Sequence, residues 1–217
     1  LYLQQDSYMS KRSNKLALDA DGVLLDYNKT AAKVWEREFN VKLVPKDLGA
    51  YHFKNQYHGI DMEAPGHRER FRARFAREGW NSMDALPGVQ EACELLVEHG
   101  FELHVVTSMP LEYEALRFEN LKNLGLPITS VTGTGSHPYL NPKAQALAKL
   151  APVAFVDDLL KNFQNVDGVH LAYLHWDAHD SPNLHQPHLK SLIHSEHMDL
   201  LSFAQYWVRE PEYGMTL

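Results

Sequence analysis

The sequence predicts an α/β fold built on a parallel β-sheet, with a small helical insertion after the first strand. Short apolar runs alternate with segments of helical periodicity along most of the 217 residues. This alternation is typical of a parallel sheet whose two faces are both covered by helices. Only residues 41–86 break the alternation, and the chain length fits one domain that carries an insertion.

Five apolar runs are the expected strands. The first covers residues 16–18 and ends at Asp19, and the others cover residues 101–106, 128–132, 153–156 and 169–174. Helices are expected at residues 30–39, 89–98, 111–124 and 142–150. Gly125 and Pro142 support two of these boundaries, because glycine is favoured just after a helix and proline in its first turn.

The insertion is rich in aromatic residues and is interrupted by Pro45, Gly59, Pro65 and Gly66. We therefore expect a helical cap over residues 28–86 and a core domain formed by residues 15–27 and 87–210. Residues 1–14 are expected to be a leader or a disordered N-terminus, with Met9 as the natural start. The first eight residues lack the basic and apolar regions of a signal peptide.

Composition excludes several classes of protein. The chain has 21 Lys and Arg against 28 Asp and Glu, which gives a net charge of −7 and a pI near 6.0. This balance disfavours nucleic-acid and membrane-surface partners, and no apolar run reaches the roughly 18 residues of a membrane span. Cys93 is the single cysteine, so no internal disulfide can form. The single cysteine indicates a reducing compartment. Together with the lack of a signal peptide it leads us to expect a cytoplasmic protein, with an organelle matrix as the alternative.

Two carboxylates stand at the end of the first strand, in the run Asp19-Ala20-Asp21-Gly22-Val23-Leu24. Residues i and i+2 of an extended chain point the same way, so both carboxylates are expected to face one site. One could act as a nucleophile while the other moves a proton, and the pair suits a hard cation such as Mg²⁺. A calcium loop would need a polar residue at Val23 and glycine at Leu24, so that alternative fails.

Polar residues also follow two other predicted strands. Thr107 and Ser108 follow the second strand and Asp157 and Asp158 follow the fourth, while Lys143 begins a helix between them. In a doubly wound sheet these strand ends meet at one edge. Four carboxylates gathered there would need a metal ion, and the hydroxyls and the ammonium group suit a phosphoryl group.

These four motifs, in this order, resemble those of the haloacid dehalogenase-like (HAD) hydrolase superfamily over about residues 15–210. The resemblance implies a Rossmann-like core, a Mg²⁺ cofactor and an aspartyl-phosphate intermediate. It implies Asp19 as nucleophile and metal ligand, and Asp21 as general acid and base with its backbone carbonyl on the metal. The remaining implied roles are phosphoryl binding by Thr107, Ser108 and Lys143, and metal binding by Asp157 and Asp158.

The run from Asp19 to Tyr27 is also similar to that of the 5′(3′)-deoxyribonucleotidases, and the insertion matches caps of the C1 type. Thr107-Ser108-Met109-Pro110 is similar to that group's Thr-Ser-Pro turn, with Met109 inserted. By this resemblance Tyr27, Tyr51 and His52 would hold a nucleobase, although His52 replaces a larger aromatic residue.

The expected function is Mg²⁺-dependent hydrolysis of a small phosphomonoester, with a 5′-nucleotidase as the first candidate. The alternatives are a phosphatase for a sugar or another metabolite, a phosphomutase, or a non-catalytic protein that binds a phosphorylated metabolite.

Three features have simpler interpretations. Asp158 could cap a helix that begins at Leu159. The arginines between residues 68 and 77 are expected on the solvated side of an amphipathic helix. The histidines at 175, 179, 185 and 188 are expected to be structural or exposed, because Pro182 and Pro187 interrupt any helix that could align them on a metal.

Overall fold

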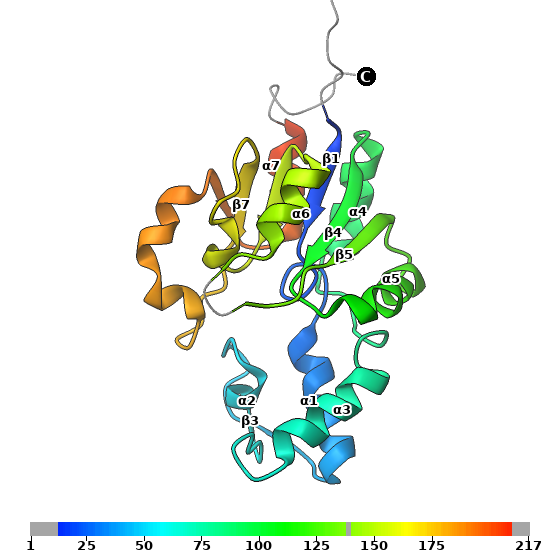
Figure 1. The fold of residues 1–217 in the computed structure, drawn as a ribbon, viewed down its shortest axis with the longest axis vertical. Coiled ribbons are helices and arrows are strands. Elements are labelled where there is room, and N and C mark those ends of the chain that lie inside the picture. The colour runs from blue at the N-terminus through cyan, green and yellow to red at the C-terminus, as the bar shows by residue number, and fades with distance from the viewer. Residues whose placement is uncertain (1–12, 138–139, 210–217) are drawn as a thin grey trace, which may run out of the picture.

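The computed structural model describes residues 13–137 and 140–209, and its centre is a six-stranded sheet in which all neighbouring strands are parallel (Figure 1). The strand order is β5-β4-β1-β6-β7-β8. The strands are β1 (Lys15–Leu18), β4 (Glu102–Thr107), β5 (Ile128–Gly133), β6 (Ala154–Asp157), β7 (His170–Leu174) and β8 (Ser195–His197). The predicted parallel α/β fold is confirmed.

Side chains that alternate along the strands form two cores, one on each face of the sheet. On β1, Leu16 and Leu18 pack into one core and Ala17 packs into the other. The first core is completed by α4 (Val89–Glu98) and α7 (Leu200–Arg209), and Cys93 is buried in it. The second core includes α6 (Lys143–Leu150) and two 3₁₀ helices, η2 (Leu160–Phe163) and η4 (Pro187–Leu192). Both faces of the sheet are therefore covered, as expected for parallel strands.

The segment between β1 and α4 forms the cap, whose elements lie together below the sheet in Figure 1. It contains α1 (Tyr27–Phe39), β2 (Val44–Pro45), α2 (Phe53–Gln56), β3 (Tyr57–His58) and α3 (His67–Glu78). Trp35, Phe53, Phe71 and Phe75 are buried and their rings pack between α1, α2 and α3. This aromatic core explains how a small insertion can fold as one unit with the sheet.

The arginines of α3 lie on its solvated side, as expected. Arg70 pairs with Glu38 at 2.8 Å and Arg74 pairs with Glu78 at 2.8 Å, while Phe71 and Phe75 face inward. The Arg70–Glu38 pair ties α3 to the end of α1, whereas the Arg74–Glu78 pair lies within α3.

Several boundaries differ from the expectations. α1 begins at Tyr27, three residues early, because the Asp26 side chain accepts the backbone N–H of Lys29 at 2.9 Å. The expected helix 111–124 divides into a 3₁₀ turn, η1 (Leu111–Tyr113), and α5 (Glu114–Asn123). Residues 182–185 form a further 3₁₀ turn, η3 (Pro182–His185).

Three strands were not expected. The cap contains the antiparallel pair β2 and β3, and β8 adds an edge to the main sheet. The cap strands have two residues each, which is too short for an alternating pattern. The sequence Ser195-Glu196-His197 lacks an apolar run because the side chains of this edge strand are exposed or only partly buried.

The expected leader of residues 1–8 lies outside the described residues, as does most of the expected N-terminal segment 1–14 and the end of the core at residue 210. Within residues 13–137 and 140–209, none of the helices is long and apolar enough to cross a membrane.

Candidate active site

The three central strands end side by side, and their last residues bring the predicted polar groups together. β1 pairs with β4 on one side and with β6 on the other. Asp19 therefore follows β1 between Thr107, the last residue of β4, and Asp157, the last residue of β6. This edge is where open α/β sheets bind ligands.

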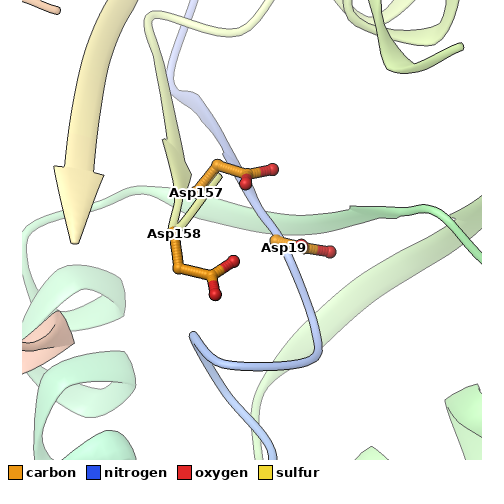
Figure 2. A group of neighbouring side chains, drawn as sticks. All are labelled: Asp19, Asp157 and Asp158. Atoms are coloured by element: carbon orange, nitrogen blue, oxygen red, sulfur yellow. The ribbon is translucent and has the colours of Figure 1, made fainter. Parts of the chain in front are cut away.

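Three buried carboxylates gather there, from Asp19, Asp157 and Asp158 (Figure 2). One oxygen of each lies within 4.8 Å of the other two, and the residues are 5%, 0% and 3% exposed. Burial raises the pKa of Asp157, although Lys143 opposes the shift, and burial together with Asp157 raises the pKa of Asp158. A set of buried carboxylate oxygens that repel one another fits a hard divalent cation such as Mg²⁺.

Lys143 supplies the positive charge that the protein itself places in this cluster. Its Nζ lies 2.6 Å from Asp157 Oδ2 and 2.8 Å from Asp19 Oδ2, and the side chain is fully buried. Burial alone would lower the pKa of Lys143, but Asp157 and Asp19 raise it above its ordinary value. Asn141 Oδ1 accepts the Lys143 backbone N–H at 3.0 Å and so fixes the start of α6.

Asn162 orients Asp157 and was not predicted. Its Nδ2 donates to Asp157 Oδ1 at 2.9 Å and to Oδ2 at 3.0 Å. Asp157 Oδ1 also accepts the backbone N–H of Leu159 at 2.8 Å. The helix-capping role considered for Asp158 is wrong, because η2 begins at Leu160 without a side-chain cap. Asp158 Oδ2 instead accepts the hydroxyl proton of Tyr51 at 3.1 Å.

Asp21 does not join the three carboxylates, in contrast to the expected convergence of four. Its Oδ1 accepts from Arg117 Nη2 at 2.8 Å, and Arg117 is fully buried in α5. The strand ends at Leu18, so the i, i+2 rule of extended chain does not extend to Asp21. Burial raises the pKa of Asp21 and Arg117 opposes that rise.

Gly22 allows the chain to turn against Asp158. Its φ is +82°, and a Cβ at this position would lie 2.6 Å from Asp158 Oδ2. The backbone conformation therefore favours glycine, and any larger residue would force the Asp158 carboxylate to move.

The two predicted hydroxyl residues take different positions at the end of β4. Thr107 is buried, and its carbonyl accepts the backbone N–H groups of Met109 and Thr134, each at 3.0 Å. Ser108 is exposed and lines a pocket together with Asp21 and Asp158.

This pocket of about 340 Å³ is lined both by residues of the core, among them Asp158, and by residues of the cap. Its aromatic lining includes the three predicted residues Tyr27, Tyr51 and His52. It also includes Phe53, Trp80 and Trp176, which were not predicted. Trp176 lies two residues beyond β7, so the rule that strand ends line the site could have identified it. A larger hollow of about 960 Å³ lies at the amino ends of the strands, away from these residues.

The rings around Tyr51 do not form a parallel sandwich. The Tyr51 ring centroid lies 5.2 Å from those of both His52 and Trp176, at interplanar angles of 89° and 55°. Burial and Asp158 raise the pKa of Tyr51, so its hydroxyl keeps its proton and donates to Asp158.

The histidines at 175 and 179 contact carboxylates. His175 Nδ1 lies 2.8 Å from Glu196 Oε1, and His179 Nδ1 lies 3.2 Å from Asp47 Oδ2. The second contact joins the loop after β7 to the cap.

The parallel sheet, the cap after β1 and the polar strand ends define a HAD-type hydrolase, a phosphoric monoester hydrolase. Residues 12–123 match the family model described as 5′ nucleotidase, deoxy (pyrimidine), cytosolic type C protein. Since the match covers half of the chain, the protein belongs to this family, and the expected resemblance to deoxyribonucleotidases is confirmed. No curated protein matches the chain.

Solved structures share the fold at low sequence identity. A HAD family hydrolase from Deinococcus radiodurans R1 with bound phosphate and sodium has a TM-score of 0.61 at 15% identity, covering 94% of this chain and 97% of the other. A haloacid dehalogenase-like hydrolase from Streptococcus pneumoniae has a TM-score of 0.58 at 15% identity, covering 90% and 98%. A predicted phosphoglycolate phosphatase from Haemophilus somnus 129PT has a TM-score of 0.59 at 16% identity, covering 91% and 99%.

Proposed function

We propose that the protein is a Mg²⁺-dependent 5′-nucleotidase that hydrolyses deoxyribonucleoside monophosphates through an aspartyl-phosphate on Asp19. The observation that carries this proposal is a pocket of about 340 Å³ whose lining combines Asp21, Ser108 and Asp158 with aromatic rings. Such a pocket can receive a phosphate group and a planar base at the same time. Membership in the nucleotidase family supports this choice of substrate.

The proposed chemistry divides between Asp19 and Asp21. Asp19 Oδ2, 2.8 Å from Lys143 Nζ, forms a bond to phosphorus while the bond from phosphorus to the ester oxygen breaks. Asp21 gives its proton to the departing oxygen, which leaves as the nucleoside hydroxyl. Asp21 then takes a proton from the water that attacks phosphorus, and inorganic phosphate leaves Asp19. Acid–base help of this kind contributes roughly 10²- to 10⁴-fold in rate.

The other groups would stabilise the charge on the phosphoryl group. Asp19, Asp157 and Asp158 would hold Mg²⁺, which offsets negative charge when it is bound. Lys143 lies between two of these carboxylates, so it limits their repulsion. Thr107 and Ser108 would bind the phosphoryl oxygens, and Met109, inserted after them, is buried.

The cap would select the rest of the substrate. We propose that residues 28–86 form this cap and that Tyr27, Tyr51 and His52 contact the base. Stacking of a base on an aromatic side chain is worth roughly 1–3 kcal/mol. The cytosolic family description and the single cysteine support a cytoplasmic location.

A panel of phosphomonoesters assayed with and without Mg²⁺ tests this function. Deoxyribonucleoside 5′-monophosphates should be hydrolysed with higher kcat/KM than sugar phosphates, phosphoglycolate or an aryl phosphate, and only with Mg²⁺. Preference for a sugar phosphate would indicate a metabolite phosphatase. Transfer of phosphate between two positions of a sugar would indicate a phosphomutase. Binding of a phosphorylated metabolite without turnover would indicate a non-catalytic role.

A further inference from the structure

The loop after β7 is joined to the cap by a carboxylate that belongs to none of the four motifs. Asp180 Oδ1 accepts the backbone N–H of Tyr51 at 2.6 Å. Asp180 Oδ2 accepts the backbone N–H of His52 at 3.2 Å and the side-chain amide of Asn55 at 2.6 Å. Both oxygens of one core residue are therefore occupied by donors of the cap.

The negative charge of Asp180 strengthens its hydrogen bonds to the cap. Burial would raise the pKa of Asp180, but hydrogen bonds from Asn55, Tyr51 and His52 hold it below its ordinary value. Hydrogen bonds to an ionised carboxylate are about twice as strong as those between neutral groups. The same loop adds the ring of Trp176 against Tyr51 and the pair of His179 with Asp47.

Tyr51 is the residue on which these contacts converge. Asp180 holds its N–H, and Asn28 Nδ2 of α1 donates to its carbonyl at 2.8 Å. Its ring packs beside Trp176, and its hydroxyl reaches Asp158 Oδ2 at 3.1 Å. The backbone, ring and hydroxyl of Tyr51 are thus each fixed, and its position links the cap to the carboxylate cluster.

We propose that Asp180 is a positioning residue that clasps the cap to the core and holds Tyr51 and His52 in place for the substrate. Its part in substrate selection rests on the proposed nucleotidase function. Asp180 is not among the residues that line the pocket. Its effect on catalysis therefore passes through Tyr51 and His52. Substrates that reach the aromatic rings need this clasp, whereas a small phosphate ester depends mainly on the core motifs.

The test compares Asp180→Ala with Asp177→Ala. Asp177 lies in the same loop and is exposed, so its substitution removes the same charge and serves as the matched control. Hydrogen exchange of the backbone N–H groups of Tyr51 and His52 is measured first, on the full protein without substrate. Exchange should be at least about tenfold faster in Asp180→Ala, because both amides lose their acceptor. Asp177→Ala should exchange like the wild type.

Steady-state kinetics provide the second measurement. Asp180→Ala should raise KM for a deoxyribonucleoside 5′-monophosphate about tenfold or more, with kcat/KM for an aryl phosphate changed by less than about threefold. Asp180→Asn keeps one acceptor oxygen, so it should have an intermediate KM and an intermediate exchange rate. If Asp180→Ala does not fold, Asp180→Asn replaces it in both measurements.

The outcomes separate this inference from the proposed function. Unchanged exchange at Tyr51 and His52 in both Asp180 variants would overturn the clasp, whatever the activity. Faster exchange with an unchanged KM, or with equal losses on both substrates, would overturn the role in selection. If the wild type hydrolysed no nucleotide, the proposed function would fall and the role in selection with it, while exchange would still decide whether the clasp exists.

Discussion

Asp19 and Asp21 are two residues apart, yet they lie in different electrostatic surroundings. Asp19 faces Lys143 at 2.8 Å and the other carboxylates, whereas Asp21 faces Arg117 at 2.8 Å. A nucleophile must be ionised, and the acid that protonates a leaving group must carry a proton. Separate surroundings allow two similar residues to take these different roles.

Substitution of Asp21 should therefore depend on the leaving group. Asp21→Asn keeps the nucleophile and removes the proton donor, so hydrolysis of an alkyl phosphate such as a nucleotide should fall about 10²- to 10⁴-fold. Formation of the phosphoenzyme from an activated aryl phosphate should be much less affected, because that leaving group hardly needs a proton. Single-turnover kinetics on the two substrates measure this first step directly. Equal losses on both substrates would contradict the assignment of Asp21 as the acid.

Gly22 provides a second test at the scale of single residues. In Gly22→Ala the new Cβ would lie 2.6 Å from Asp158 Oδ2 and would displace that carboxylate from the cluster. Gly66→Ala is the control, because Gly66 also has a positive φ, +77°, but no atom within 4 Å of the added Cβ. The free energy of unfolding should fall by about 1 kcal/mol in both variants, because alanine is strained at a positive φ. It should fall by about 1–3 kcal/mol more in Gly22→Ala, because the added Cβ crowds Asp158.

Urea unfolding of the two glycine variants measures this difference, and a Mg²⁺-dependent assay measures its effect on the site. Gly22→Ala should lose most of its activity, while Gly66→Ala should keep it. Equal stability and equal activity would mean that the approach of Gly22 to Asp158 is unimportant.

At the scale of the secondary-structure elements, a group of histidines lies at β7 and β8, formed by His170, His197 and His194, which precedes β8. The Nε2 atoms of His170 and His197 lie 2.8 Å and 2.9 Å from the Ser195 hydroxyl oxygen, and the rings of His170 and His194 lie 5.2 Å apart. Burial, together with His194 and His197, lowers the pKa of His170 to about 4. The folded protein therefore favours the neutral form of the His170 side chain.

This histidine should make stability depend on pH. Its pKa in the unfolded chain is about 6.5, so the unfolded state binds a proton at a higher pH than the folded state. The stabilising contribution is full above pH 6.5 and declines as the pH falls toward 4. Between pH 7 and pH 5 the free energy of unfolding of the wild type should fall by about 1 kcal/mol more than that of His170→Gln, after allowance for partial exposure of the ring. Urea unfolding at the two pH values tests this, and identical pH dependence would contradict it.

The elements that the sequence predicts well are those with strong apolar runs. β1, β4 and β6 and the polar residues at their ends could be located because buried strands have a clear pattern and parallel strands end at one edge. β8 could not be found this way, since Ser195, Glu196 and His197 give an edge strand without an apolar run.

The remaining parts of the site depend on tertiary contacts that no local pattern encodes. Asn162 orients Asp157 and Asp180 holds Tyr51, and each is an ordinary polar residue in its own segment. Arg117, in a helix of low amphipathicity, becomes buried only because α5 packs beside the Asp21 turn. The direction of the Asp21 side chain likewise follows from this packing, so the sequence could place Asp21 near the site but could not identify its partner.

At the scale of the whole molecule, the sheet and the cap lie one above the other (Figure 1), and residues of both line the pocket. The sheet supplies Asp19, Asp157 and Asp158, and the cap supplies Tyr51, whose hydroxyl reaches Asp158. Under the proposed function, phosphate chemistry and the choice of substrate would belong to different parts of one chain. A rigid sheet suits reacting groups, which need fixed geometry.

The central claim is that Asp19 becomes phosphorylated during hydrolysis of a nucleotide. The most direct test is to mix the wild type with a deoxyribonucleoside 5′-monophosphate and Mg²⁺, quench with acid within the first turnover, and locate the added phosphoryl group by peptide mass spectrometry. The account predicts one phosphoryl group on Asp19, absent when Mg²⁺ is removed and absent in Asp19→Asn. Nucleotide hydrolysis by Asp19→Asn at a near-normal rate, or a phosphoryl group carried by a different residue, would contradict it.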